Sequence, residues 1–211
     1  DGYGENIEIV LGYGAYHKTS GVLNKLIRFE TFPTAMQYLS YALAGIPYMG
    51  VGRNLSYKKD IFLRNKGFSS INHIPSGDDD LFINKVATKK NTSIVIDPDA
   101  ITRSVPKTTW GVWLKQKKRH YTTAKYYKPK HKFLLGLYFA TQFIFYPLFI
   151  ATILLYDWRF VLPVFGLRLI LQAFVLNKSM KKMGEGDLWP LFLFLDMWMF
   201  FYYIIFAPAL W

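Results

Sequence analysis

The chain has 211 residues, of which 52% are hydrophobic and 18% aromatic, and a formal net charge of +12. It contains no cysteine, which excludes a disulfide framework, a thiol nucleophile and a thiolate metal site. The apolar residues concentrate after residue 132, so we expect an α/β part followed by membrane helices. Because neither an initiator methionine nor a signal peptide stands at Asp1, we also expect this sequence to be a piece of a longer protein.

Residues 1–106 are expected to form the α/β part. Alternating apolar side chains predict a strand over 5–13. The pattern then favours a helix from about Val22 that is interrupted at Pro33 and resumes over 34–44. The remaining expected elements are short strands around a turn over 48–57, a helix over 58–66 capped by Gly67, a helix from Asp79 to about Lys89, and a strand over 93–97.

The turn Gly50-Val51-Gly52 allows two interpretations. A dinucleotide-binding loop would need a third glycine and a following helix, and this stretch has neither. A tight connection between strands fits better, and it would present Arg53 and Asn54.

The run Gly77-Asp78-Asp79-Asp80 is the strongest candidate for a chemical role. One or two aspartates at the start of a helix complement the helix dipole. Three adjacent carboxylates repel one another, which favours a functional requirement. A carboxylate in this position can deprotonate a hydroxyl or help to hold a cation, and the residue types alone do not choose between these roles.

Residues 107–132 carry nine Lys or Arg side chains and no Asp or Glu. Such a block is typical of nucleic-acid binding or of the cytoplasmic flank of a membrane helix, where it also attracts anionic lipids. We favour membrane lipid and no nucleic acid, because the block directly precedes an apolar stretch that begins at Phe133.

A helical wheel over residues 108–127 separates two faces. One face is apolar apart from Lys117, and it carries Trp110, Trp113, Leu114, Tyr121 and Ala124. Gln116, Arg119, His120 and Thr123 lie on the other. This pattern predicts a basic amphipathic helix in the membrane interface rather than a buried core helix. Gln116 and Arg119 are three residues apart and can jointly contact a phosphate or a sugar, although such a pair is usually solvated surface.

Three membrane-spanning helices are predicted, over 133–156, 160–176 and 188–211. The first contains 24 residues without a charge, enough to cross a hydrocarbon core of ~30 Å. The second is weaker because it contains Pro163, Arg168 and Gln172, and the third contains Asp196. Since Arg168 and Asp196 are both costly in lipid, we expect them to pair inside the bundle.

Lysine placement predicts the topology of these helices. The basic block before residue 133 and the cluster over 178–182 should both face the cytoplasm. We therefore expect a multi-pass membrane protein with residues 1–132 cytoplasmic, three crossings and Trp211 on the opposite side.

The order of the polar motifs resembles the family 2 inverting glycosyltransferases of the GT-A fold. The motifs are Gly-Val-Gly-Arg-Asn-Leu-Ser-Tyr-Lys-Lys (50–59), Gly-Asp-Asp-Asp-Leu (77–81) and Gln-Lys-Lys-Arg-His (116–120). That family has a G-x-N-x-A-x-R-R-like segment, then an acid pair that carries the catalytic base, then Q-x-x-R-W on an interfacial helix before membrane helices. The similarity covers roughly residues 45–132.

The resemblance implies roles for individual residues. Asp79 matches the general base and Asp78 the first acid of the pair. Gln116 and Arg119 match the Q and R that line the donor diphosphate and the acceptor. His120 stands where the family has the Trp that packs against the acceptor sugar. The expected substrate-binding residues are Gln116, Arg119 and His120, together with Arg53, Asn54 and Asp80.

The resemblance also implies that residues 1–106 are the acceptor half of a GT-A catalytic domain. The nucleotide-binding half, with the D-x-D motif that holds a divalent cation (Mg or Mn), would precede Asp1. Asp97-Pro98-Asp99 follows a predicted strand but comes after the base motif, so its order is wrong for that role. No metal ligand is therefore expected among these residues.

The implied function is transfer of a sugar, with inversion, from a nucleotide-sugar to a glycan or glycolipid acceptor at the membrane. By itself this piece is expected to be inactive. The alternative is a non-catalytic membrane protein whose basic face binds anionic lipid or a partner. That alternative accounts for the charge and the apolar helices, but not for the three aspartates or the Gln116 and Arg119 face.

Overall fold

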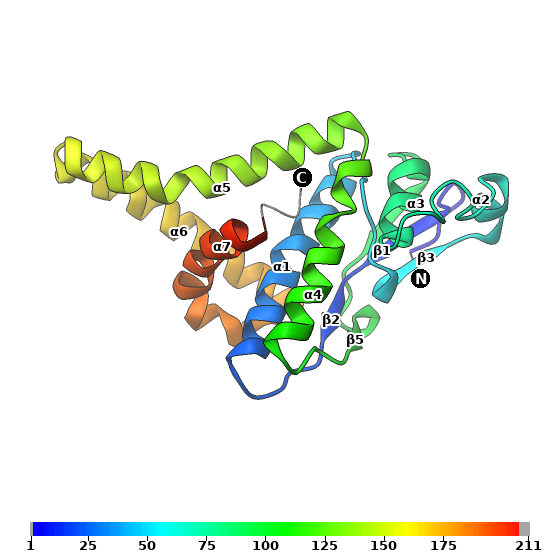
Figure 1. Cartoon of the computed structure of the whole chain (residues 1–211), viewed down its shortest axis with the longest axis horizontal. Coiled ribbons are helices and arrows are strands. Elements are labelled where there is room, and N and C mark those ends of the chain that lie inside the picture. Colours follow the sequence, from blue (N-terminus) through cyan, green and yellow to red (C-terminus); the bar gives the residue numbers. More distant parts are fainter. Residues whose placement is uncertain (1, 207–211) are drawn as a thin grey trace.

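A computed structural model describes residues 2–206. The chain is mostly helical (Figure 1). Residues 2–128 form a body with small sheets at one end, and a long hairpin of two helices extends away from it. Within the described range, three helical segments are long and apolar enough to cross a membrane. The α/β expectation is thus confirmed only as a small mixed sheet with helices around it.

The structure has two small sheets, and their strands β1 and β2 are consecutive in the chain. In the first, β1 (Ile9–Gly12) lies between β3 (Leu55–Tyr57), which is antiparallel, and β4 (Thr92–Val95), which is parallel. In the second, β2 (Gly14–Tyr16) pairs in parallel with β5 (Thr102–Ser104). The predicted strand over 5–13 is therefore confirmed at its centre, and all four residues of β1 are buried.

The first long helix, α1 (Val22–Leu43), continues through Pro33. The predicted interruption is wrong, although proline removes one hydrogen bond of the ladder. Core packing offsets this loss, because Phe29, Phe32 and Ala35 are each at most 2% exposed on the buried side of the helix.

Short elements connect the sheets to the helices. They are the 3₁₀ turns η1 (Gly52–Asn54), η2 (Pro98–Ala100) and η3 (Ala124–Tyr126) and the helices α2 (Lys59–Arg64) and α3 (Asp78–Val86). Gly67 follows α2 with a positive φ of 54°, as its predicted capping role requires. The aspartate run forms the first turn of α3, so the helix predicted there is confirmed.

The helix expected in the membrane interface is α4 (Trp110–Tyr121), and its apolar side packs against protein. Trp113 is 2% exposed and lies against Tyr202 and Phe206, with ring centroids 6.1 and 5.8 Å away. The expectation that Trp113 faces lipid is therefore wrong. Lys117, the cation on the apolar face, reaches the buried carboxylate of Glu30 at 2.5 Å, which explains its position there.

Three further helices follow: α5 (Pro129–Leu155), α6 (Trp158–Lys182) and α7 (Phe192–Phe206), with the 3₁₀ segment η4 (Gly186–Leu191) before α7. Helix α6 is longer than predicted over 160–176, and α5 starts before residue 133. Helices α5 and α6 form the projecting hairpin (Figure 1). Residues 207–211 of the third predicted span lie outside the described residues.

Helix α7 runs antiparallel to α5. Its Asp196 contacts Tyr146, its Phe200 stacks on Phe143, and its Tyr203 lies against Phe139. Since α5 leaves the body at Pro129, Tyr146 lies about 25 Å along it at 1.5 Å per residue, and Phe139 lies nearer the body. Helix α7 thus runs back toward the body.

Both ends of the η4–α7 segment contact the body. Before η4, Glu185 is 1% exposed and accepts hydrogen bonds from Arg28 of α1 at 2.8 and 2.5 Å and from Tyr13 at 3.0 Å. At the other end, Phe206 stacks on Tyr121 of α4 with ring centroids 5.4 Å apart. The segment first runs beside α6, where Trp189 donates to the Ala173 carbonyl, and then runs beside α5 back toward the body.

Candidate functional site

The loop before β3 and the first turn of α3 meet at Asp79. Its Oδ2 accepts the Gly52 backbone N–H at 2.5 Å, and its Oδ1 accepts the Asp80 N–H at 2.9 Å. A Cβ at Gly52 would lie 2.9 Å from Asp79 Oδ2, so only glycine lets the carboxylate approach this closely. Gly52, at the end of the Gly50-Val51-Gly52 turn, therefore holds the Asp79 carboxylate.

The start of α3 also packs against the end of α4. Gly77 has a φ of 80°, and a Cβ there would lie 2.2 Å from the Thr123 side chain. The Thr123 hydroxyl donates to the Ser76 carbonyl at 3.4 Å. Residues 76–80 and the segment that follows α4 are therefore in direct contact, although more than 40 residues separate them in the chain.

Asp80 differs from its two neighbours because it points inward. The buried Tyr127 donates to its Oδ2 at 3.3 Å. Burial, followed by the charge of Asp79, raises the pKa of Asp80 well above its usual range, and the Tyr127 hydrogen bond only partly opposes this. Asp80 is therefore better suited to positioning α3 than to contacting a substrate.

Tyr57 of β3 lies near the exposed aspartates at the start of α3. Its pKa is raised, first by burial and then by the charges of Asp78 and Asp79. Asp78 itself is exposed at the helix start. The carboxylates of Asp78 and Asp79 thus act on one phenol, and Asp78 has the freer approach from solvent.

Arg53 and Asn54 are held by the backbone around β2. Arg53 donates to the Ala15 carbonyl at 3.0 Å, and its guanidinium lies 4.2 Å from the Tyr16 ring centroid. Asn54 donates to the Tyr13 and Ala100 carbonyls at 2.9 and 2.7 Å. These contacts give Asn54 a structural role in joining the two sheets.

Helix α4 presents the remaining predicted residues. Gln116 is half-buried, and Arg119 and His120 are exposed. Crowding by protein atoms, then the cations Lys117, Arg119 and Arg53, lowers the pKa of His120 to about 4, so the ring is neutral at pH 7. Of these causes, the charge of Arg53 is the smallest.

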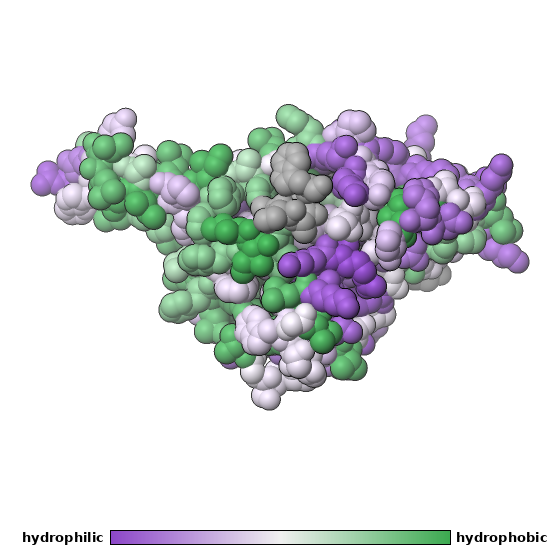
Figure 2. Space-filling model, in the orientation of Figure 1, coloured by the Kyte–Doolittle hydropathy of each residue, from purple (hydrophilic) through white to green (hydrophobic). Residues whose placement is uncertain are grey.

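Hydrophilic side chains gather over α4 and the start of α5, beside the apolar surface of the membrane helices (Figure 2). Among residues 2–206, no group of three or more His, Cys, Asp or Glu side chains could hold a metal ion. The carboxylates of Asp79 and Asp80 point to different partners, Gly52 and Tyr127. The described residues therefore do not fit a cation site of their own.

Tyr127, which contacts Asp80, was not predicted, because nothing in its local pattern distinguishes it from the residues around it. Thr123 was placed on the polar face of the helix with Gln116 and Arg119, but its contact with Ser76 was not predicted. Comparison of the chain with protein-family models found no match, and neither did comparison with curated protein sequences.

Proposed function

We propose that this chain belongs to a membrane-bound inverting glycosyltransferase that moves a sugar from a nucleotide-sugar to a lipid-linked or polysaccharide acceptor. The observation that supports this is the contact of the first two motifs at Asp79. The Gly52 N–H binds its carboxylate, and Thr123, which follows the third motif, packs on Gly77 of the second. A purely structural acid run would not need a glycine turn shaped around one carboxylate.

In the proposed reaction, Asp79 accepts the proton of an acceptor hydroxyl as that oxygen attacks the anomeric carbon. The bond from this carbon to the nucleotide diphosphate breaks, and the diphosphate leaves from the opposite face. The N–H groups of Gly52 and Asp80 each occupy one lone pair of the carboxylate and fix its orientation. The remaining lone pairs accept no hydrogen bond from residues 2–206 and would take the proton, and general-base help of this kind contributes about 10²–10⁴-fold.

Arg119 is proposed to bind the leaving diphosphate. It is exposed on α4, and no acid lies in residues 107–132 to compete for it. Developing negative charge on the diphosphate would be stabilised by this fixed cation. A divalent cation, held by residues outside this chain, is part of the same proposal.

We place the body and the basic block of 107–132 on the cytoplasmic side, with α5 and α6 crossing the bilayer as a hairpin. The two ends of α6 support this, because Trp158 at its far end is exposed, whereas Met180 near its other end and Met183 just after it are buried. The η4–α7 segment is proposed to enter the membrane part-way and return. This replaces the three crossings expected from hydropathy.

A non-catalytic role in binding anionic lipid is the second candidate, favoured by nine cations beside the first membrane helix. The two proposals differ in what Asp79 does. The test is transfer of radiolabelled sugar from UDP-glucose, UDP-N-acetylglucosamine, UDP-galactose or GDP-mannose into the lipid and polymer fractions, using full-length protein in native membranes. Wild-type protein should transfer at least one sugar, and Asp79→Asn should transfer it at least ~100-fold more slowly.

Lys118→Ala is the matched control, because Lys118 is exposed on α4 beside Arg119 and has no assigned role in binding or catalysis. Its transfer rate should stay near the wild-type rate. No transfer from any donor by the wild-type protein, or an unchanged rate in a folded Asp79→Asn protein, would favour the lipid-binding role.

A further inference from the structure

A buried ion pair joins α1 to α4 beside the proposed substrate residues. Glu30 of α1 and Lys117 of α4 lie 2.5 Å apart, and their side chains are 3% and 13% exposed. Lys117 directly follows Gln116 and stands two positions before Arg119. Among the nine cations of 107–132, it is the only one that forms a salt bridge within residues 2–206.

Stability alone does not explain a buried ion pair at this place. Removing two charges from water costs about as much free energy as their attraction contributes, so apolar side chains of similar volume would join the two helices equally well. An ion pair differs from apolar contacts because it is directional, with each charged group meeting its partner at one place. Such a pair suits a helix whose rotation about its own axis matters.

The pair lies on the side of α4 that faces protein. Trp113, Lys117 and Tyr121 are four residues apart, so they lie along one side of the helix. Trp113 and Tyr121 pack against aromatic side chains of α7. At 3.6 residues per turn, Arg119 points roughly 160° away from Lys117. Fixing the direction of Lys117 therefore also fixes the direction of Arg119.

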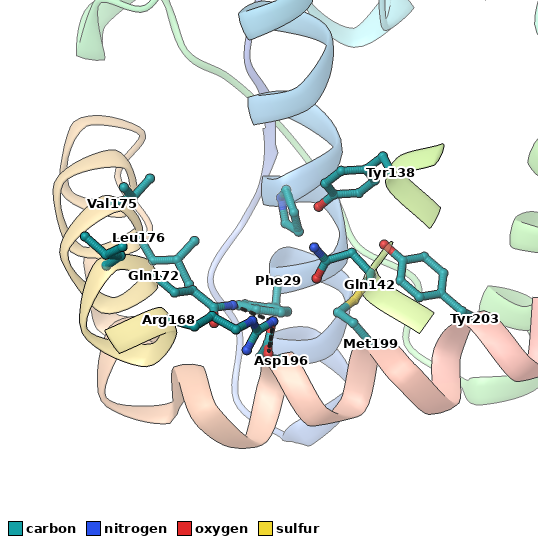
Figure 3. Close-up of a pocket in the computed structure, with 12 residues that line it drawn as sticks. Phe29, Tyr138, Gln142, Arg168, Gln172, Val175, Leu176, Asp196, Met199 and Tyr203 are labelled. Atoms are coloured by element: carbon teal, nitrogen blue, oxygen red, sulfur yellow. Dashed lines mark hydrogen bonds and ion pairs between the residues drawn. The ribbon is translucent and has the colours of Figure 1, made fainter. Parts of the chain in front are cut away.

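Helix α7 contacts the same carboxylate. The Tyr202 hydroxyl donates to Glu30 Oε2 at 3.4 Å, while Lys117 lies at Oε1. Glu30 thus joins α1, α4 and α7. Beside it, Phe29 and Tyr203 line a cavity of about 480 Å³, so α1 and α7 are not fully packed against each other there (Figure 3). Because packing is incomplete on that side, the directional contacts of Glu30 have more influence on how the three helices are placed.

Further along α7, Asp196 connects this helix to α6. Asp196 accepts a hydrogen bond from Gln172 at 2.6 Å and lies 3.5 Å from Arg168 (Figure 3). The expected pairing of Arg168 with Asp196 is confirmed. Helix α7 is therefore held by its own polar contacts and gives Glu30 a fixed neighbour.

We infer that Glu30 is a positioning residue for sugar transfer, because its ion pair with Lys117 fixes the rotation of α4 and thereby the direction of Arg119. The inference rests on the proposed function, in which Arg119 binds the leaving diphosphate. Glu30 is buried, so it acts through α4 and not by contact with a substrate. Removal of its charge should therefore affect transfer only as far as it displaces Arg119.

The test is a double-mutant cycle in the full-length protein, with whichever of the four nucleotide-sugars named above the wild type uses. Glu30→Gln keeps the shape of the side chain but leaves Lys117 without an anion, and it should lower kcat/KM roughly tenfold, since a misplacement of about 1 Å costs roughly 100-fold. In an Arg119→Lys background the same change should cost less than about twofold, because the bidentate fork that it positions is already absent. In a Lys118→Ala background it should again cost roughly tenfold.

Phe32→Leu is the matched control for stability. Phe32 is fully buried in the same helix, and it belongs to a different core cluster from Trp113. Any loss of rate that Phe32→Leu causes should be equal with arginine or lysine at position 119. A loss for Glu30→Gln that is equally large in both backgrounds would mean that Glu30 only stabilises the protein, and it overturns the inference.

A second measurement does not need activity. The 211 residues contain no cysteine, so spin labels at Lys118→Cys and Lys59→Cys, both exposed, can report where α4 lies relative to α2, once any cysteine elsewhere in the full-length protein is replaced. In double electron–electron resonance, Glu30→Gln should shift or broaden the distribution of distances between the labels, and Phe32→Leu should not. An unchanged distribution in folded Glu30→Gln overturns the inference.

If Glu30→Gln does not fold, the double variant Glu30→Gln/Lys117→Met takes its place, because removing both charges leaves neither one buried without a partner. It should unfold near the wild-type temperature and still give the same kinetic and distance results. Wild-type kcat/KM together with a wild-type distance distribution in the double variant overturns the inference. Absence of transfer by the wild-type protein from all four donors refutes the proposed function and the role in transfer with it, whereas the label distances still decide whether Glu30 holds α4.

Discussion

Replacing Gly52 with alanine tests whether the turn holds the Asp79 carboxylate for chemistry. The added Cβ would lie 2.9 Å from Asp79 Oδ2, whereas ordinary contact begins at 3.4 Å. The carboxylate must therefore move by about 0.5 Å. Since a misplacement of about 1 Å in an active site costs roughly 100-fold, we expect Gly52→Ala to slow sugar transfer roughly tenfold, or about 1.4 kcal/mol in activation free energy.

The effect on folding should be smaller than the effect on activity. The Gly52 N–H to Asp79 hydrogen bond is weakened rather than removed, which costs at most about 1 kcal/mol of unfolding free energy. Transfer of labelled sugar and thermal unfolding would be measured on the same preparations of full-length protein. The expected signature is a clear loss of turnover with a small change in melting temperature.

Two glycine controls separate position from stability. A Cβ at Gly111 in α4 meets no atom within 4 Å, so Gly111→Ala should leave turnover unchanged and stabilise the helix by up to about 1 kcal/mol. A Cβ at Gly50 would meet Leu11 and Leu55 side chains at 3.0 Å, so Gly50→Ala should lower stability first. Wild-type turnover in Gly52→Ala would refute the idea that this turn positions a catalytic carboxylate.

Three other outcomes are expected. Arg119→Lys should lose a large part of the transfer activity and Arg119→Ala nearly all of it, because lysine keeps the charge but not the bidentate fork. If Lys118→Ala lost as much activity, α4 would act only as a basic patch. Topology reporters fused after residues 157 and 206 should report opposite sides, with 206 cytoplasmic; an exported signal at 206 would contradict the returning path of α7. Folding favours the protonated Asp80, so the unfolding free energy should fall as pH rises from about 4 through the raised pKa of Asp80. In thermal unfolding between pH 5 and 9, Asp80→Asn should remove that fall. Equal pH dependence in the two proteins would argue against a buried carboxyl.

Local patterns in the sequence were sufficient for much of the fold. The β1 strand, the start of α3 at the aspartates and the hairpin of α5 and α6 all follow from periodicity, capping and apolar length. The pairing of Arg168 with Asp196 also followed, because two opposite charges in apolar helices have few other partners. The continuity of α1 through Pro33 did not follow, since the core packing that offsets the lost hydrogen bond comes from distant segments.

The direction of α7 and the surroundings of Asp79 depend on contacts between segments that are far apart in the chain. Hydropathy measures how apolar a segment is and how long, but it carries no information on which neighbour the segment meets, so the return of α7 toward α4 was not predictable. The burial of Trp113 is a consequence of that return, because α7 supplies the apolar surface that lipid was expected to provide. Likewise, the sequence places Gly52 and Asp79 in separate polar motifs and Thr123 just after a third. Their contacts need side chains to approach Gly52 and Gly77 so closely that a Cβ would clash, and these approaches join segments far apart in the chain, which local sequence patterns do not specify.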